Sequence, residues 1–415
     1  MNSDWTFCDG TGKQGITRRD LILGGVGGLG VLGWSSSLAQ VVIGSKSEAE
    51  NTLVVVFLRG GADGLNAIVP YRDDAYHRAR PTIALKQSEV IDLDGFFGLH
   101  PKLGSLRPAY ESGSMAVVHA VGSGDQTRSH FEAMATMERG VRTPESSASG
   151  GWLARYLQSQ PRKVESPLRA VALGSVMPDS LRGGTNAVSI GSLDEFKLNA
   201  TQDFQENLTA IYSGPDSVAQ AGRETLAVLD TLAKLNVQRY VPKNGARYPN
   251  SDLGGALKQV ALLLSANVGM EVACLDKGGW DTHVVQGGTE GWQASLFEDV
   301  ANSLAAFAQD VGTGMSKVTV VVMTEFGRRL YENSGYGTDH GRGSFMLALG
   351  GGVRGGKVYG MWPGLAEADL EGPGDLKVTT DYRQVLSEVL AKRMDVRVPS
   401  KVFPGLDPAP LGVMA

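Results

Sequence analysis

The side chains with the clearest chemical potential are three histidines, which stand in polar, glycine-rich segments directly after apolar runs. These are His130, His283 and His340. Asp281 lies two residues before His283, and Asp339 lies directly before His340. Imidazole and carboxylate are ligands that zinc and manganese take in proteins, and hydrolytic sites use such ions to polarise an ester oxygen. The pattern predicts a divalent metal site, with zinc or manganese as the ion.

Other polar residues occupy similar positions and also have ordinary structural explanations. Asp63 follows an apolar run and would serve equally well in a turn. Ser129 and Glu132 have the spacing of a capping box, which begins a helix. Arg128 and the free N–H groups of that helix would favour an anionic group near Ser129. The remaining histidines, His77, His100 and His119, lie outside these segments and are expected to be structural or solvated.

The elements that must position these residues are apolar, β-branched runs alternating with amphipathic segments. The runs at 52–58, 115–121, 168–173, 268–275 and 317–323 predict buried strands. The segments at 226–235, 257–264 and 292–311 carry apolar stripes at helical spacing. This alternation predicts an α/β fold with a mainly parallel central sheet and helices on both faces. Ligands bind at the carboxyl ends of parallel strands, so the polar residues that follow the runs should converge there.

The first residues of the chain predict export in the folded state. Arg18 and Arg19 precede a short apolar stretch at 21–38 that contains six glycines and ends in small residues. A glycine costs about 1 kcal/mol against alanine inside a helix, which disfavours an ordinary buried helix. We therefore expect a twin-arginine signal peptide at 1–39, handled by the twin-arginine translocase, and a single domain at 40–415. The protein should be periplasmic or secreted, with no stable membrane anchor after cleavage.

Composition narrows the partners and the redox chemistry. The net charge is −5, and no basic stretch stands out, so nucleic acid is not an expected partner. Of the two cysteines, Cys8 leaves with the leader, so the exported domain has no internal disulfide. Cys274 stands in an apolar run and is expected to be a small buried core residue.

Five motifs carry a resemblance to a known group of proteins. They are Phe57–Gly64, Arg128–Phe131, Gly279–His283, Thr324–Arg328 and Thr338–Gly341. At these residues the sequence resembles the alkaline-phosphatase-like superfamily of metal-dependent hydrolases and mutases. In particular it looks like an uncharacterised branch exported with twin-arginine leaders. The resemblance extends from residue 53 to about residue 404 and implies the superfamily's fold.

The resemblance also implies roles for the first part of the predicted site. Asp63 matches the aspartate that ends the first strand and bridges to a metal. Asp281 and His283 resemble the pair that holds a second metal, at a closer spacing than is usual in the superfamily.

For the later part of the chain, the resemblance distinguishes two motifs. Glu325 ends a buried strand and takes the place of a carboxylate ligand. Asp339 and His340 come later, before a closing apolar strand, so His340 matches the superfamily's last metal histidine. The nucleophile position falls on Ser129 or Thr127, beside Arg128 and His130.

Together these expectations lead to two hypotheses of different classes. The first is an exported metal-dependent hydrolase of phosphate or sulfate esters, acting on an anionic small molecule or polymer. The second is a non-catalytic binding or assembly protein that keeps the fold with an incomplete or structural metal site. A redox enzyme with an organic cofactor is disfavoured, since no dinucleotide-binding glycine motif follows a strand and no cysteine pair remains after export.

Overall fold

The computed structural model describes residues 50–160, 166–184, 187–196, 202–235, 237–397, 399–407 and 409–415. The predicted leader lies outside these residues. Within them, no helix has the length and apolar character needed to cross a membrane.

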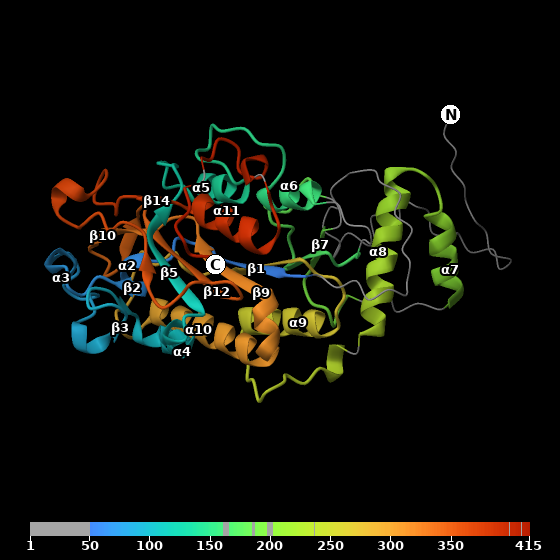
Figure 1. The fold of residues 1–415 in the computed structure, drawn as a ribbon, viewed down its shortest axis with the longest axis horizontal. Coiled ribbons are helices and arrows are strands. Elements are labelled where there is room, and N and C mark those ends of the chain that lie inside the picture. Colours follow the sequence, from blue (N-terminus) through green and yellow to red (C-terminus); the bar gives the residue numbers. More distant parts are fainter. Residues whose placement is uncertain are drawn as a thin grey trace.

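The fold is organised around one large sheet whose strands run almost entirely in one direction (Figure 1). Its order in the described residues is β13-β5-β12-β9-β1-β8-β6-β7, with β14 also paired to β5. The strands are β1 (Thr52–Leu58), β5 (Met115–Gly122), β6 (Ala170–Leu173), β7 (Ala187–Ile190), β8 (Val272–Lys277), β9 (Val318–Thr324), β12 (Ser344–Gly350), β13 (Val358–Tyr359) and β14 (Thr380–Asp381). Only β12 is antiparallel to its neighbours β5 and β9, while every other pairing in this sheet is parallel.

Helices cover both faces of this sheet, and the residues of β1 alternate between two cores. Val54, Val56 and Leu58 pack with α9 (Asp252–Ser265) and α10 (Trp292–Val311). Leu53, Val55 and Phe57 pack on the other side with α5 (His130–Glu138), α6 (Trp152–Ser159) and α11 (Tyr382–Arg393). Figure 1 shows the same two layers on either side of the sheet. A strand buried on both faces has no polar positions to alternate with, which explains the continuous apolar run in its sequence.

Smaller elements lie around this core. A three-stranded sheet has the order β2-β4-β3, from β2 (Ile68–Val69), β3 (Ile91–Asp92) and β4 (Gly98–Leu99). A hairpin pairs β10 (Arg328–Glu332) with β11 (Thr338–His340). The remaining α-helices of the described residues are α2 (Gly64–Ala67), α3 (Asp74–Ala79), α4 (Arg107–Glu111), α7 (Gln202–Ile211) and α8 (Ser217–Lys234).

The predicted fold class is confirmed, with one difference in strand direction. The sequence prediction agrees with the structure in the α/β class and the mainly parallel sheet. It also agrees in the strands β1, β5 and β9 and in the bounds of α10. The closing strand predicted after His340 is β12, and it enters the middle of the sheet in the opposite direction. Its amino end therefore lies at the same edge as the carboxyl ends of β5 and β9, which brings His340 to the edge where the other polar loops lie.

Candidate metal centre

Residues from three distant parts of the chain meet at this edge of the sheet. His130 is the first residue of α5, Asp281 lies in the loop after β8, and His340 ends β11. One donor atom from each of these residues lies within 4.8 Å of the others. His283 joins the group by contacting Asp281 and His340. These four side chains therefore converge, as the sequence predicted for the polar residues that follow the strands.

Asp281 is the hub of this cluster, because one of its oxygens faces all three imidazoles. The Nε2 atoms of His340, His283 and His130 lie 2.9, 3.0 and 3.4 Å from Asp281 Oδ1. The Nε2 atoms of His283 and His340 are 2.8 Å apart. Gly60, with φ +123°, permits this geometry, since a Cβ there would lie 2.7 Å from the backbone nitrogen of Asp281.

The opposite nitrogen of each imidazole faces an oxygen that can only accept a hydrogen bond. His130 Nδ1 lies 2.7 Å from Glu325 Oε1, and His283 Nδ1 lies 3.2 Å from Asp339 Oδ1. His340 Nδ1 lies 2.9 Å from the backbone oxygen of Arg128. Each Nδ1 therefore carries the ring proton, and the three Nε2 atoms present lone pairs to one another and to a carboxylate oxygen.

Such a convergence of lone pairs is repulsive unless a cation lies among them. His130 Nε2 is buried and has no hydrogen-bond partner; its 3.4 Å approach to Asp281 has the distance of an ion pair without the alignment of a hydrogen bond. Donor atoms around a tetrahedral zinc ion lie about 3.3 Å apart. The donor–donor distances of 2.8–3.4 Å in the cluster equal this value or would increase by a few tenths of an ångström when an ion binds. Metal-binding histidines commonly have the other ring nitrogen held by a carboxylate or carbonyl. These residues therefore fit a divalent ion, and the imidazole-rich set favours zinc.

A buried arginine balances the charge of the cluster. The Arg328 side chain is 0% exposed, and its Nη2 donates to Asp281 Oδ1 at 2.8 Å. Its other N–H groups donate to backbone oxygens, including those of Gly61 and Thr338. Arg328 thus ties the loop after β1 to the loop that carries Asp281 and keeps that aspartate ionised.

The pKa shifts agree with these contacts. Although burial opposes it, the close His340 imidazole, together with the hydrogen bond and the positive charge of Arg328, holds the pKa of the Asp281 carboxyl well below its usual range. The hydrogen bond with Glu325 raises the pKa of His130, and burial lowers the pKa of His340. The ionised carboxylate and the neutral imidazole are the forms that bind a metal. A proton on His130 would compete with the metal for the same nitrogen.

The sequence predicts Glu325 and Asp339 as ligands, but in the structure each contacts the Nδ1 atom of a histidine, on the side of the ring away from the cluster. Glu325 is buried, and its Oε1 also accepts from the backbone N–H of Gly60 at 2.8 Å. Asp339 Oδ1 also accepts from Asn333 at 3.0 Å. Both carboxylates orient an imidazole and are not among the converging donors.

Asp63, expected to bridge a metal, lies outside the cluster. It is fully buried, and both of its oxygens accept from Arg80, at 2.5 and 3.1 Å. Gln286 Nε2 donates to it as well, at 2.8 Å. Asp63 also caps α2 by accepting from the backbone N–H of Leu65. A carboxylate saturated in this way by a guanidinium holds the fold together and offers no lone pair to an ion.

The residues expected at the nucleophile position have different surroundings. The Arg128 guanidinium pairs with the buried carboxylate of Asp375, so it is not free to hold a substrate anion, contrary to the expectation. The Thr127 hydroxyl donates to Asp125 and accepts from the backbone N–H of Ser129. Ser129 caps α5 without a side-chain hydrogen bond, so the predicted capping box does not form.

Several contributors to the site were missed by the sequence interpretation. Phe326 and Arg328 lie inside the motif Thr324–Arg328, but their residue types gave no sign of a role at the site, and Arg80 lies outside every motif. Phe326 packs its ring 4.9 Å from those of both His130 and His340. The sequence pattern groups His130 with His283 and His340, whereas the family resemblance assigns His130 to the nucleophile position and not to the ligands.

The other histidines and the cysteine agree with their structural interpretations. His100 and His119 are buried, and their ring nitrogens bond to the backbone oxygens of Gly288 and Ile68. Burial lowers the pKa of each to about 4. Cys274 is buried in the core, and burial raises the pKa of its thiol.

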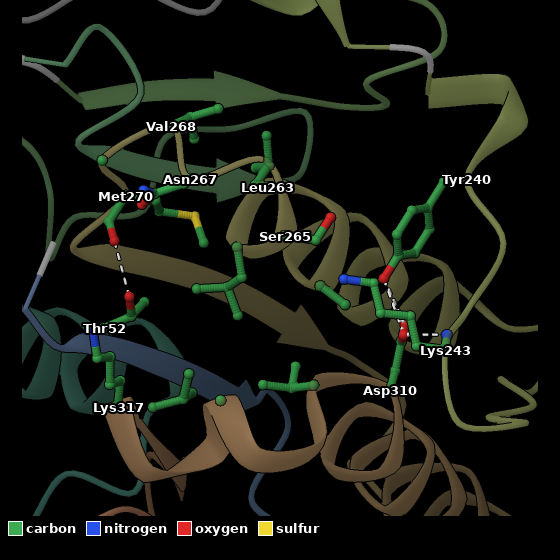
Figure 2. A pocket seen from close by; sticks show the side chains of 16 residues that line it. Thr52, Tyr240, Lys243, Leu263, Ser265, Asn267, Val268, Met270, Asp310 and Lys317 are labelled. Carbon is green, nitrogen blue, oxygen red and sulfur yellow. Dashed lines mark hydrogen bonds between the residues drawn. The ribbon is translucent and has the colours of Figure 1, made fainter. Parts of the chain in front are cut away.

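A cavity of about 290 Å³ lies at the opposite edge of the sheet, where β1 and β9 begin (Figure 2). Its one buried carboxylate, Asp310, accepts hydrogen bonds from Tyr240, Tyr248 and the backbone N–H of Lys243. Since these donors surround Asp310, the cavity offers no set of metal donors comparable to the cluster.

The chain belongs to the family described as "Protein of unknown function (DUF1501)", whose model matches residues 99–404. The match includes His130, Asp281, His283 and His340. No curated protein matches the sequence.

Among solved structures, those to which the chain is similar include two described as sulfatases and a periplasmic domain in complex with Zn. The PsFucS1 sulfatase from Pseudoalteromonas sp. is 11% identical over 88% of this chain and 73% of its own, with a TM-score of 0.39. The C-terminal periplasmic domain of EcEptC from Escherichia coli, in complex with Zn, is 10% identical over 74% of each chain, with a TM-score of 0.32. A putative sulfatase from Bacteroides thetaiotaomicron is 8% identical over 75% of this chain and 67% of its own, with a TM-score of 0.34. Similarities at this level decide nothing about the activity of this chain.

Proposed function

We propose that this member of the DUF1501 family is an exported metal-dependent hydrolase of anionic esters, either phosphate or sulfate esters. The observation that carries the proposal is the convergence of three imidazole Nε2 atoms on Asp281, while each Nδ1 is held by an acceptor. Proteins build this arrangement to hold a metal ion in a fixed position.

Three of the residues suffice to form a catalytic centre. His130, Asp281 and His340 provide one donor each, and a catalytic zinc site takes three protein ligands and leaves the fourth position open. When bound there, a divalent ion would polarise an ester oxygen and lower the pKa of an attacking water. Arg328 offsets the negative charge of Asp281, and Arg329 pairs with Asp339. With Glu325 counted as well, a divalent ion would leave the loaded centre with a net positive charge, which suits an anionic substrate.

His283 lies against two of these three donors, with its Nε2 3.0 Å from Asp281 Oδ1 and 2.8 Å from His340 Nε2. Its side chain is 39% exposed, the most accessible of the imidazoles in the cluster, and Asp339 holds its Nδ1. In this orientation its Nε2 either completes the coordination or accepts a proton from the attacking group. His283→Ala separates the two roles: loss of bound metal indicates a ligand, and loss of turnover with metal retained indicates a proton acceptor.

Ser129 is the candidate nucleophile. It directly precedes His130, and its hydroxyl makes no hydrogen bond within the described residues. The hydroxyl of Thr127, the alternative nucleophile, already donates a hydrogen bond to Asp125. Ser129→Ala should abolish turnover without loss of metal if the serine attacks, and should leave turnover in place if a water attacks.

Export sets where the reaction would occur. The arginine pair Arg18–Arg19 supports delivery by the twin-arginine translocase to the periplasm or beyond. The substrates we expect are anionic esters, small or polymeric, outside the cytoplasm. The release of the domain from the membrane after cleavage is part of the same proposal.

The test is metal-dependent turnover by the exported protein. The purified domain, loaded with zinc or manganese, is assayed against aryl phosphates and aryl sulfates, with and without a chelator. We expect turnover that the chelator removes and that the double variant His130→Ala with His340→Ala lacks. His77→Ala is the matched control, because His77 binds a backbone oxygen outside the cluster. Turnover that survives in the double variant would contradict the proposal.

One observation favours the second candidate, a binding or assembly protein. Asp63, which the superfamily resemblance assigns to a bridging position, is saturated by Arg80. A two-metal clamp on a phosphoryl group therefore lacks a carboxylate here. Stoichiometric metal binding without turnover of any phosphate or sulfate ester would favour this candidate over the hydrolase.

A further inference from the structure

Large apolar side chains are exposed beside the histidines of the metal centre. Phe131 directly follows His130 and is 83% exposed. Val284 and Val285 directly follow His283 and are 68% and 66% exposed. Isolated exposed apolar residues are common, but a concentration of them around one site usually marks a binding surface.

The turn that contains Tyr336 adds a fourth such side chain. Tyr336 is 60% exposed. Its neighbours pack against the loop of His283, because a Cβ on Gly335 would lie 3.5 Å from Val284 Cγ2 and a Cβ on Gly337 would lie 2.5 Å from the backbone oxygen of His283. We call the set Phe131, Val284, Val285 and Tyr336 the apolar rim.

The backbone holds part of this rim in an unfavourable conformation. Val285 has φ +49° and Tyr336 has φ +60°. Positive φ is rare for a β-branched residue, and its presence near a site points to a functional constraint. Two backbone hydrogen bonds fix the conformation, from Val285 N–H to Gly335 O at 2.8 Å and from Gln286 N–H to Tyr336 O at 2.9 Å.

The loop after β8 also reverses the usual distribution of polar and apolar side chains. Thr282 and Gln286 are buried and bonded to each other at 3.0 Å, and Thr338 donates to the same Gln286 oxygen at 2.6 Å. The two valines between them face solvent instead. A loop with polar side chains inside and valines outside loses apolar burial unless something covers the valines.

We propose that the substrate of the metal centre is amphiphilic, with an anionic ester group attached to an alkyl or aryl group that lies against the apolar rim. The inference rests on the proposed hydrolase function and names its substrate class. Phe131, Val284 and Val285 directly follow donor histidines in the sequence, and the turn of Tyr336 packs on the His283 loop, which fits an occupant whose polar end reaches the ion. In the hydrolysis, the ester bond breaks, water adds its hydroxyl to phosphorus or sulfur, and the leaving oxygen takes a proton. The products are the apolar alcohol and the inorganic anion.

The test measures how affinity depends on the apolar group alone. Zinc-loaded protein is titrated calorimetrically with n-alkylphosphonates from methyl to octyl, below the concentrations at which they form micelles. A methylene that is fully buried strengthens binding about fourfold, so we expect about two- to fourfold per methylene over the first few carbons. Phe131→Ser should flatten this dependence, so that the affinity for octylphosphonate falls by a larger factor than the affinity for methylphosphonate.

Val241→Ser is the matched control. Val241 is 77% exposed and lies next to Tyr240, beside the cavity at the opposite edge of the sheet. It should keep the full dependence on chain length. Equal affinity for methyl- and octylphosphonate in the unaltered protein would overturn the inference, as would a Phe131→Ser variant that keeps the full dependence.

Turnover assays on the same preparations distinguish this inference from the proposed function. If binding depends on chain length but no ester is hydrolysed, the hydrolase proposal fails and the amphiphile site stands. If methyl and octyl esters, which have nearly equal leaving groups, are hydrolysed with equal kcat/KM, the hydrolase proposal stands and the amphiphile inference fails.

Discussion

Glu325→Gln is the substitution that tests most sharply how the imidazoles are oriented. The change keeps the shape of the side chain and removes its charge. Glu325 is buried, and its Oε1 accepts from His130 Nδ1 at 2.7 Å and from the Gly60 N–H at 2.8 Å. A glutamine oxygen can still accept these bonds, so the apo fold should survive while the electrostatic support of His130 is lost.

The size of the effect follows from the distances. The 2.7 Å hydrogen bond, the width of the ring and a bond of about 2.0 Å place the carboxylate about 6–7 Å from an ion held by His130 Nε2. A unit charge at this distance from a divalent ion contributes about 1 kcal/mol in water and about 5 kcal/mol at an effective dielectric constant of 20. Arg328 screens part of this charge. Substitutions at such positions weaken metal affinity about 10- to 100-fold, or about 1.4–2.7 kcal/mol, which lies within these bounds.

Competition with a chromophoric zinc chelator measures this affinity. Glu138→Gln is the matched control, because it also removes a buried carboxylate, from the same helix as His130, and its partner is Arg59. We expect Glu325→Gln to bind zinc about 10- to 100-fold more weakly and Glu138→Gln to bind it as the unaltered protein does. Zinc affinities of the two variants within threefold of each other would refute the orientation argument.

Three further predictions concern stability and export. Asp63→Asn leaves its arginine partner buried and unpaired, so urea unfolding should show a loss of about 3–5 kcal/mol with the bound metal retained; loss of metal would restore Asp63 as a ligand. His100 and His119 have pKa values of about 4 when folded against 6.5 as the ordinary value, so the unfolded chain takes up more protons below pH 6.5. Stability should therefore fall as the pH drops from 6.5 towards 4, by at most about 1.4 kcal/mol per pH unit for each histidine, and the double change to glutamine should flatten that part of the curve. Replacing Arg18 and Arg19 with lysine should leave the protein in the cytoplasm; normal amounts of the variant in the periplasm would mean that the leader was misinterpreted.

The fold was predictable because its strongest signals are local. Seven consecutive apolar or β-branched residues at Thr52–Leu58 have few alternatives to a strand buried on both faces. The stripe from Trp292 to Val311 matches the helix residue for residue at both ends. The direction of β12 is not local information, since it depends on how the hairpin of β10 and β11 returns the chain to the sheet.

The sequence predicted which types of residue would lie at the strand ends, but it did not show which of them would bind the metal directly. His130, Glu325 and Asp339 all follow apolar runs, and the spacing does not say which side chain reaches the ion and which one holds a ring. Asp63 is the clearest case, because its partner Arg80 lies seventeen residues further along the chain, at the end of α3, and has no visible link to the motif. Long-range contacts decided these roles.

The most direct test of the account is a crystal structure of the exported domain, purified without chelators, with anomalous data collected on both sides of the zinc absorption edge. We predict one anomalous peak per chain, about 2.0–2.2 Å from His130 Nε2, His340 Nε2 and Asp281 Oδ1. Manganese in place of zinc would appear at the same position at its own edge. A cluster with no anomalous peak at either edge, or a peak bound to Asp63 instead, would contradict the account.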